Sequence, residues 1–308
     1  MVRFSKLAFR ARRPPSVLPG SPHVANAPIV FMHIPKTSGH ALITGLREAI
    51  APRRMIGGHD RVLFGGFCAF DSLAPHIQDL IYLDPSDVPT DCDFVAAHMA
   101  FSTLQSRYGA ANYLTVLREP LSRILSAWLF GRALSQDQLA EWGEWADYLR
   151  HAMRSLEHFL SCPAIACGTD NVSVRMLLWP HRLIPDDDFI DTCNDEVLVD
   201  EAITRLSEFG FLDVIENPDM LANLQCWLGR PVQYARINET ACTPLSLKRP
   251  LHNELTPETT DLLETRSRLD QRLWTLLARH RIRGACVEKL QRRVILRNTA
   301  RHSWLMMA

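Results

Sequence analysis

The segment APIVFMHIPKTSGHALITGLREAI (27–50) constrains the fold of this chain more than any other. Its apolar run, 29–34, predicts a short buried strand. A Pro-Lys-Thr-Ser-Gly turn follows, and an amphipathic helix is predicted over 39–50. A strand that ends in such a turn against a helix N-terminus is typical of an anion site, because the turn amides point outward and the helix dipole favours negative charge. Lys36 adds a positive charge to this turn.

The rest of the chain alternates between predicted strands and helices. Short apolar runs predict further strands at 94–97, 113–117, 211–215 and 232–238. Helices are predicted at 72–82, 120–132, 141–160, 194–209, 218–228 and 256–280. This alternation predicts an α/β fold with a central, mostly parallel sheet. Because such sheets bind ligands outside the carboxyl ends of their strands, we expect Lys36, His98 and Arg118 to face one crevice.

A second segment, YLTVLREPLSRILSAWLF (113–130), has chemistry that complements the first turn. Arg118 ends the predicted strand, and Ser122 and Ser126 lie four residues apart on one face of the helix that follows. An arginine and nearby hydroxyls hold a phosphate through charge-assisted hydrogen bonds. The turn at Lys36 is not a Walker A loop, because G-x-x-x-x-G-K-S/T is absent. A magnesium-bound nucleoside triphosphate is therefore disfavoured as the ligand.

Charge is balanced over the 308 residues, with 34 Lys and Arg against 34 Asp and Glu, and predicts no nucleic-acid partner. We expect a flexible, basic N-terminal segment (1–27), one domain (28–282) and a basic C-terminal tail or helix (283–308). The basic ends leave open a peripheral contact with an anionic membrane surface. No apolar run reaches the ~20 residues of a membrane span, and the N-terminus lacks the features of a signal peptide, so a cytoplasmic protein is expected.

The eight cysteines lie far apart without a C-x-x-C pair, which fits neither a zinc site nor a redox motif. Buried free thiols are the favoured interpretation, although Cys162 and Cys167 are close enough in sequence for a disulfide. The acidic run at 186–191 lacks the spacing of a calcium loop and is interpreted as a solvated loop. Trp142 and Trp145 are interpreted as core residues, with the wall of an acceptor groove as the alternative.

The two anion-binding segments together resemble those of the sulfotransferases. HIPKTSGHAL resembles their 5′-phosphosulfate-binding loop, and LREPLSRILSAW resembles their 3′-phosphate-binding segment. The carbohydrate sulfotransferases related to heparan sulfate 2-O-sulfotransferase carry a similar H-x-P-K-T loop and R-D/E-P-x-x-R-x-x-S helix. Weaker similarities in FLDVIENPDM, RINET and the helix that contains Asp270 extend the resemblance over about residues 28–280. It implies a three-layer, P-loop-NTPase-like sandwich around the sheet. The expected absence of a membrane anchor separates the chain from the membrane-tethered Golgi members of the family and favours a bacterial source.

The resemblance also implies a donor, 3′-phosphoadenosine 5′-phosphosulfate (PAPS), and a role for each matching residue. Lys36 corresponds to the lysine that contacts the bridging oxygen of the donor and stabilises the leaving phosphate. His98, in AAHMAF, corresponds to the general base that takes a proton from the acceptor hydroxyl. Arg118 and Ser126 correspond to the ligands of the 3′-phosphate. The backbone amides expected to cradle the 5′-phosphate belong to Thr37, Ser38, Gly39, His40 and Ala41.

The expected activity is transfer of a sulfuryl group, without a metal, to a hydroxyl acceptor for which a carbohydrate is the favoured class. Two alternatives remain at this point. One is a binding protein that keeps the fold without turnover, since His40 and Ala41 replace hydroxyl-bearing residues of the family loop. The other is a P-loop-type phosphotransferase, which predicts magnesium dependence and an aspartate at a strand end. The predicted strands are followed instead by His98, Arg118 and Glu216.

Overall fold

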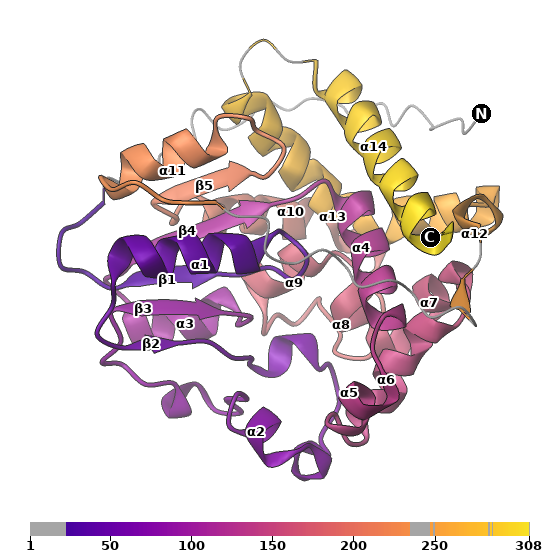
Figure 1. Cartoon of the computed structure of the whole chain (residues 1–308), viewed down its shortest axis with the longest axis horizontal. Helices are drawn as coiled ribbons and strands as arrows, with labels where there is room; N and C mark the ends of the chain where they lie inside the picture. The colour runs from indigo at the N-terminus through magenta and orange to yellow at the C-terminus, as the bar shows by residue number, and fades with distance from the viewer. Residues whose placement is uncertain (1–22, 235–246, 249, 283, 285, 308) are drawn as a thin grey trace.

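A five-stranded, all-parallel sheet in the order β2-β3-β1-β4-β5 forms the centre of the computed structural model (Figure 1). The model describes residues 23–234, 247–248, 250–282, 284 and 286–307. Its strands are β1 (Ile29–Met32), β2 (Met55–Ile56), β3 (Phe94–Ala97), β4 (Asn112–Leu117) and β5 (Phe211–Val214). The prediction of an α/β fold with a mostly parallel sheet is therefore confirmed. The edge strand β2 was not predicted, and 232–234 form no strand, while the rest of the predicted strand 232–238 lies outside the described residues.

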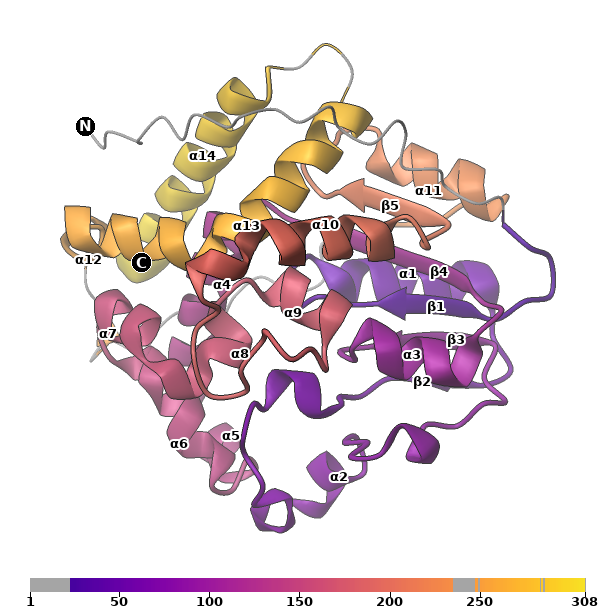
Figure 2. The same cartoon turned by 180° about the vertical axis from the view of Figure 1, so that it is seen from behind.

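Helices cover both faces of the sheet and give the molecule three layers. Figures 1 and 2 show α1 (Gly39–Ile50) and α11 (Met220–Leu228) on one face. The other face carries α3 (Phe101–Tyr108), α9 (Val172–Leu178), α10 (Asp195–Leu206) and α13 (Pro257–Arg281). The strands are apolar on both sides because both are covered. In β1, Phe31 packs toward α1 and α11, and its neighbours Val30 and Met32 pack toward the opposite layer.

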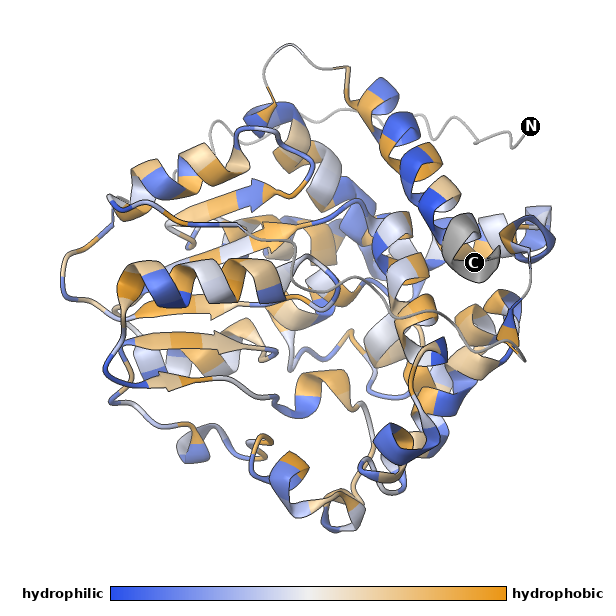
Figure 3. Cartoon of the chain, in the orientation of Figure 1, coloured by the Kyte–Doolittle hydropathy of each residue, from blue (hydrophilic) through white to orange (hydrophobic). Residues whose placement is uncertain are grey.

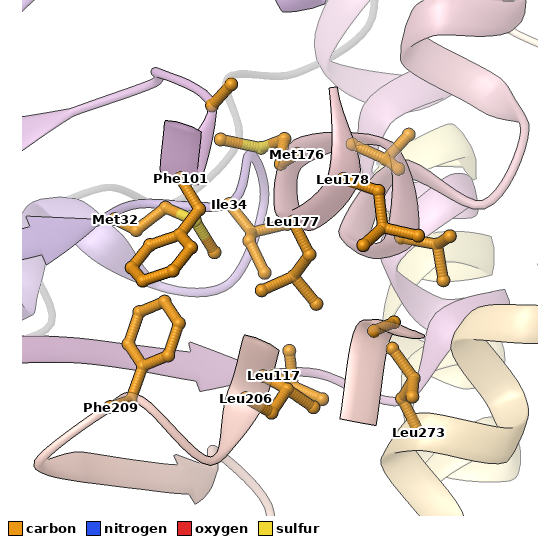
Figure 4. Packing of buried hydrophobic residues seen from close by; sticks show 14 of the residues in the cluster. Met32, Ile34, Phe101, Leu117, Met176, Leu177, Leu178, Leu206, Phe209 and Leu273 are labelled. Atoms are coloured by element: carbon orange, nitrogen blue, oxygen red, sulfur yellow. The ribbon is translucent and has the colours of Figure 1, made fainter. Parts of the chain in front are cut away.

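The larger core lies between the sheet and the layer of α3, α9, α10 and α13 (Figure 4). In this core the rings of Phe101 and Phe209 lie 4.8 Å apart, centroid to centroid, and Leu117 and Leu206 pack close to them. Figure 3 shows the strands as almost continuously hydrophobic, while polar residues gather on the outer sides of the helices. The burial of this sheet fixes the positions of the residues that follow each strand.

A group of helices stands beyond the carboxyl ends of the strands (Figure 1). It contains α4 (Pro120–Arg132), α5 (Gln136–Ala140), α6 (Trp145–Arg150), α7 (Leu156–Ser161), α8 (Ala166–Thr169), α12 (Leu251–Glu254) and α14 (Val287–Met307). The continuous helix predicted over 141–160 is wrong. Gly143 adopts a left-handed φ of 48°, Arg154 is extended, and Ser155 caps a new helix by accepting from the amide of His158. The C-terminal segment, expected as a tail or helix, forms the long helix α14.

The start of the described chain is attached to the sheet. The amide of Val24 donates to Oδ1 of Asn112 at 2.7 Å, and Nδ2 of Asn112 donates back to the Val24 carbonyl at 2.8 Å. Residues 1–22 of the predicted N-terminal segment lie outside the described residues. In the part of the chain that the structure describes, no helix is both long and apolar enough to span a lipid bilayer.

Candidate functional site

The strand ends bring together residues from three distant parts of the sequence. His33 and Lys36 follow β1, His98 follows β3, and Arg118 follows β4. Strands β1 and β3 are neighbours, but the helices that follow them, α1 and α3, lie on opposite faces of the sheet (Figures 1 and 2). A parallel sheet opens a crevice at such a point, outside the carboxyl ends of its strands. The turn at Lys36 and His98 lie at this point of the sheet.

The turn between β1 and α1 has an unusual backbone. Lys36 and Ser38 both adopt left-handed conformations, with φ of 70° and 63°. For residues with a Cβ this conformation costs about 1–2 kcal/mol each and is found where a site needs a particular backbone shape. Thr37 is buried between them, and its Oγ1 donates to the Ile34 carbonyl at 2.8 Å. The buried hydrogen bond of Thr37 therefore holds the turn in its strained backbone conformation.

The N-terminus of α1 is open to an anion. Ser38 occupies the N-cap position, but its side chain accepts no hydrogen bond from the helix. The first amides of a helix have no acceptor within the helix itself, and the helix dipole adds positive potential there. The residues concerned are Gly39, His40 and Ala41, of which His40 is exposed. These amides follow the strained turn directly, as expected for a phosphate cradle.

Lys36 lies in a partly apolar setting. Its Nζ stands 3.9 Å from the centroid of the Phe130 ring on α4. Burial, together with the nearby charge of Arg118, lowers the pKa of Lys36 to about 8. Nη1 of Arg118 donates to the Lys36 carbonyl at 2.9 Å. This bond ties the start of α4 to the turn and places two cations side by side.

Two buried carboxylates organise the start of α4. Glu119 caps the helix, because its side chain accepts from the amides of Leu121 and Ser122. Glu216, which follows β5, accepts from the Glu119 amide at 2.9 Å and from Nε1 of Trp274 at 3.0 Å. Burial raises the pKa of Glu216 to about 7. Both carboxylates are occupied by these contacts, and Nε of Arg118 is buried without a hydrogen-bond partner among the described residues.

Helix α4 also carries the predicted phosphate ligand Ser126. Ser122 and Ser126 are both buried and lie one helical turn apart on the same face, as predicted. Arg123, between them in sequence, is only 2% exposed. All three of its guanidinium nitrogens are buried without a partner in the described part of the chain. The sequence analysis assigned no role to Arg123 and did not predict its burial.

His98 has the hydrogen-bonding state of a general base. Its Nδ1 lies 2.6 Å from the His33 carbonyl oxygen, and because a carbonyl only accepts, Nδ1 carries the proton. Nε2 is therefore the unprotonated nitrogen and is available to accept a proton. Burial lowers the pKa of His98 to about 3, so the imidazole is neutral at physiological pH. The side chain is partly exposed at the crevice.

His98 is sandwiched between two other histidine rings. The His33 ring lies 4.2 Å from it and the His59 ring 5.1 Å, centroid to centroid. Burial lowers the pKa of His59 to about 4 and that of His33 well below the usual value, so the stack is neutral. The sequence analysis missed His59. It follows the two-residue strand β2 through Gly57 and Gly58, and the strand-end rule would have identified it had β2 been recognised.

The two tryptophans proposed for an acceptor groove have different surroundings. Trp145 is buried and stacks on Tyr148 at 4.5 Å within a cluster of Phe64, Phe67 and Phe70, so it is a core residue. Trp142 is only partly buried, and its ring stands edge-on to His59 at 6.3 Å. Of the two, Trp142 is therefore the one next to the histidine stack.

Gly39 is the residue on which His33, and through it His98, depends. A Cβ at position 39 would lie 1.8 Å from Nε2 of His33, and the His33 ring is buried at 4% exposure. We expect Gly39→Ala to lower the free energy of unfolding by about 1–3 kcal/mol through overpacking. Gly168→Ala is the matched control, because a Cβ there meets no atom within 4 Å. Denaturant unfolding of both variants measures the effect, and equal stability of the two would contradict the close packing of His33 on Gly39.

The expectation of mostly buried thiols is wrong for the described cysteines: Cys92 and Cys167 are buried, whereas Cys68, Cys193, Cys226 and Cys286 are exposed. Every cysteine in the described part of the chain is a free thiol, including Cys162 and Cys167, so the alternative of a disulfide between those two is wrong. In the same residues, no group of three or more His, Cys, Asp or Glu side chains is placed to hold a metal ion.

Comparison of the chain with protein-family models and with curated proteins finds no match.

Proposed function

We propose that this protein is a PAPS-dependent sulfotransferase that acts on a hydroxyl acceptor, with carbohydrates as the favoured class. The observation that carries the proposal is the position of His98. Its Nδ1 carries the proton, so its Nε2 is free to accept one, and its ring packs 4.2 Å from His33, three residues before Lys36. A neutral base next to a cationic, amide-rich turn suits a reaction in which a hydroxyl loses a proton as an anionic group leaves.

The donor is proposed to span the two segments that the Arg118–Lys36 bond joins. Its 5′-phosphosulfate lies against the turn and the first amides of α1, where the helix dipole favours an anion. Its 3′-phosphate lies against Arg118 and Ser126 at the start of α4. The closeness of the two cations supports this arrangement, because the charge of Arg118 contributes to the lowered pKa of Lys36.

The proposed transfer is a single in-line displacement at sulfur. The acceptor oxygen forms a bond to sulfur as its proton moves to Nε2 of His98. The bond between sulfur and the bridging oxygen of the 5′-phosphate breaks, and its electron pair stays on that oxygen. Lys36 stabilises the negative charge that develops there. The products are the sulfated acceptor and adenosine 3′,5′-bisphosphate, and His98 returns its proton to water.

The experiment that tests the donor site is calorimetric titration with adenosine 3′,5′-bisphosphate and with adenosine 5′-phosphate. We expect micromolar affinity for the bisphosphate, independent of magnesium, and at least about tenfold weaker binding of the monophosphate. Arg118→Ala should abolish this preference, because the charge-assisted bonds to the 3′-phosphate are lost. Arg230→Ala is the matched control, since Arg230 also donates to backbone carbonyls, those of Ala49 and Ile50, at the far end of α1.

The titration also separates the alternatives. Equal affinity for the two nucleotides would contradict a 3′-phosphate site. Magnesium-dependent binding of a nucleoside triphosphate would favour a phosphotransferase. Tight bisphosphate binding without sulfuryl transfer to any hydroxyl acceptor, followed with ³⁵S-labelled donor, would favour a binding protein that lacks turnover.

A further inference from the structure

One face of the C-terminal helix α14 packs against α4. Nε2 of Gln291 donates to Oε1 of Glu119 at 3.4 Å and to Oε1 of Gln271 at 2.8 Å. Ile295, one turn later, packs against the apolar cluster that includes Leu121 and Leu125 of α4. Figure 3 shows hydrophilic and hydrophobic residues alternating along this helix, and Figure 1 shows its last turns beside α4. His302 follows Ile295 by seven residues, so it lies on the same face of the helix.

His302 is buried without a hydrogen-bond partner. It is 5% exposed, and its Nδ1 is inaccessible to water and has no partner among the described residues. Leaving a buried polar atom unpaired costs about 1–3 kcal/mol, and such atoms in native proteins call for an explanation such as an absent ligand.

The groups around His302 are cations. Burial, and then the charges of Arg118, Arg301 and Lys36, lower the pKa of His302 to about 3. Nε of Arg118 is likewise buried without a partner in the described residues, and so are the three nitrogens of Arg123 on the same helix. Buried nitrogens of His302, Arg118 and Arg123 therefore have no acceptor among the described residues.

The carboxylates nearest these donors are already in use. Glu119 accepts from the first amides of α4, and Glu216 accepts from the Glu119 amide and from Trp274. Asp270, whose charge acts on Arg123, accepts from the amides of Ser173 and Val174. An anion from outside the protein, with several acceptor oxygens, is the chemistry that these unpaired donors fit.

We propose that α14 forms one wall of the donor site and that Nδ1 of His302 donates a hydrogen bond to the phosphate group that Arg118 holds. This inference rests on the proposed function, because the phosphate is taken to be the 3′-phosphate of the donor. The neutral imidazole donates from Nδ1 in the tautomer that carries its proton on that nitrogen.

Three variants test the role of His302 by calorimetric titration with the same two nucleotides. We expect His302→Ala to weaken binding of adenosine 3′,5′-bisphosphate about tenfold or more and to leave binding of adenosine 5′-phosphate unchanged. His302→Asn is expected to recover most of the lost affinity, because its amide nitrogen takes the place of Nδ1. Arg297→Ala removes an exposed positive charge from the same helix and is expected to have no effect.

The outcomes separate this inference from the function it rests on. Wild-type protein that fails to prefer the bisphosphate contradicts the proposed function itself. Wild-type preference that persists unchanged in His302→Ala overturns only the role of His302. Equal weakening for both nucleotides, with a lower melting temperature, also overturns it, because it indicates a purely structural residue. If His302→Ala does not fold, affinity in His302→Asn decides, and a tenfold loss in that folded variant counts against donation from Nδ1.

Discussion

Replacing His98 by alanine is expected to lower turnover by about 10²- to 10⁴-fold and to leave affinity for adenosine 3′,5′-bisphosphate nearly unchanged. The side chain has a free Nε2 at the crevice and no predicted contact with the nucleotide phosphates. Single-turnover transfer from ³⁵S-labelled donor measures the rate, and calorimetry measures the affinity. His280→Ala, on the exposed end of α13, is the control for loss of an imidazole. A fall in affinity that matches the fall in rate would make His98 a binding or structural residue.

The pH dependence of the transfer rate is a second test of the role of His98. A histidine base works in its neutral form, which exists above its pKa. Because burial lowers the pKa of His98 to about 3, the rate should not decline between pH 8 and pH 5 as it would with an ordinary histidine of pKa near 6.5. An acidic limb centred near pH 6.5 in wild-type protein would contradict the buried, neutral stack of His33, His59 and His98.

Replacing Lys36 by alanine is expected to lower turnover by about 10²- to 10³-fold, because the charge on the leaving phosphate loses its nearest cation. Lys289→Ala, an exposed lysine on α14, is the matched control and should be silent. Transfer rates at saturating donor isolate this effect from binding. Unchanged turnover in Lys36→Ala would remove the lysine from the reaction and favour a role confined to its contact with Phe130.

Lys36 also predicts an alkaline limit to activity. An ammonium is charged below its pKa, and in the free protein burial and Arg118 lower that pKa to about 8. Activity at low donor concentration should therefore fall as the pH rises above about 8. The Lys36→Arg variant keeps its charge at these pH values. Its activity, although lower, should therefore not fall above about pH 8.

The strands and the candidate site residues that follow them could be predicted where the sequence pattern is local. Short apolar runs mark β1, β3, β4 and β5, and the strand-end rule then places Lys36, His98 and Arg118 together. Strand β2 has only two residues, too few for any periodicity, and it becomes a strand because it pairs with β3. His59, which β2 positions, was missed for that reason.

The part of the site contributed by α14 could not be predicted for a different reason. The segment reads as a basic helix or tail, and nothing local determines which face of it packs or against which helix. That choice depends on tertiary contacts such as Gln291 with Glu119. The burial of His302 depends on how this helix packs, so it could be seen only in the folded chain.

The hydrogen bonds of Asp60 affect which parts of this chain can change in sequence. Its buried carboxylate accepts from the amide of Ala100 at 2.8 Å and from Oγ1 of Thr103 at 2.7 Å, and the neighbouring His59 forms a bridge with His98. These contacts of His59 and Asp60 with residues 98–103 therefore hold together the two ends of the segment 61–93. The same segment also contacts the histidine stack, because the amide of His59 donates to the Leu80 carbonyl at 2.8 Å and the amide of Tyr82 donates to the His59 carbonyl at 2.9 Å. A substitution in this segment is therefore expected to affect the histidine stack as well as the surroundings of Trp142, so the two cannot vary independently.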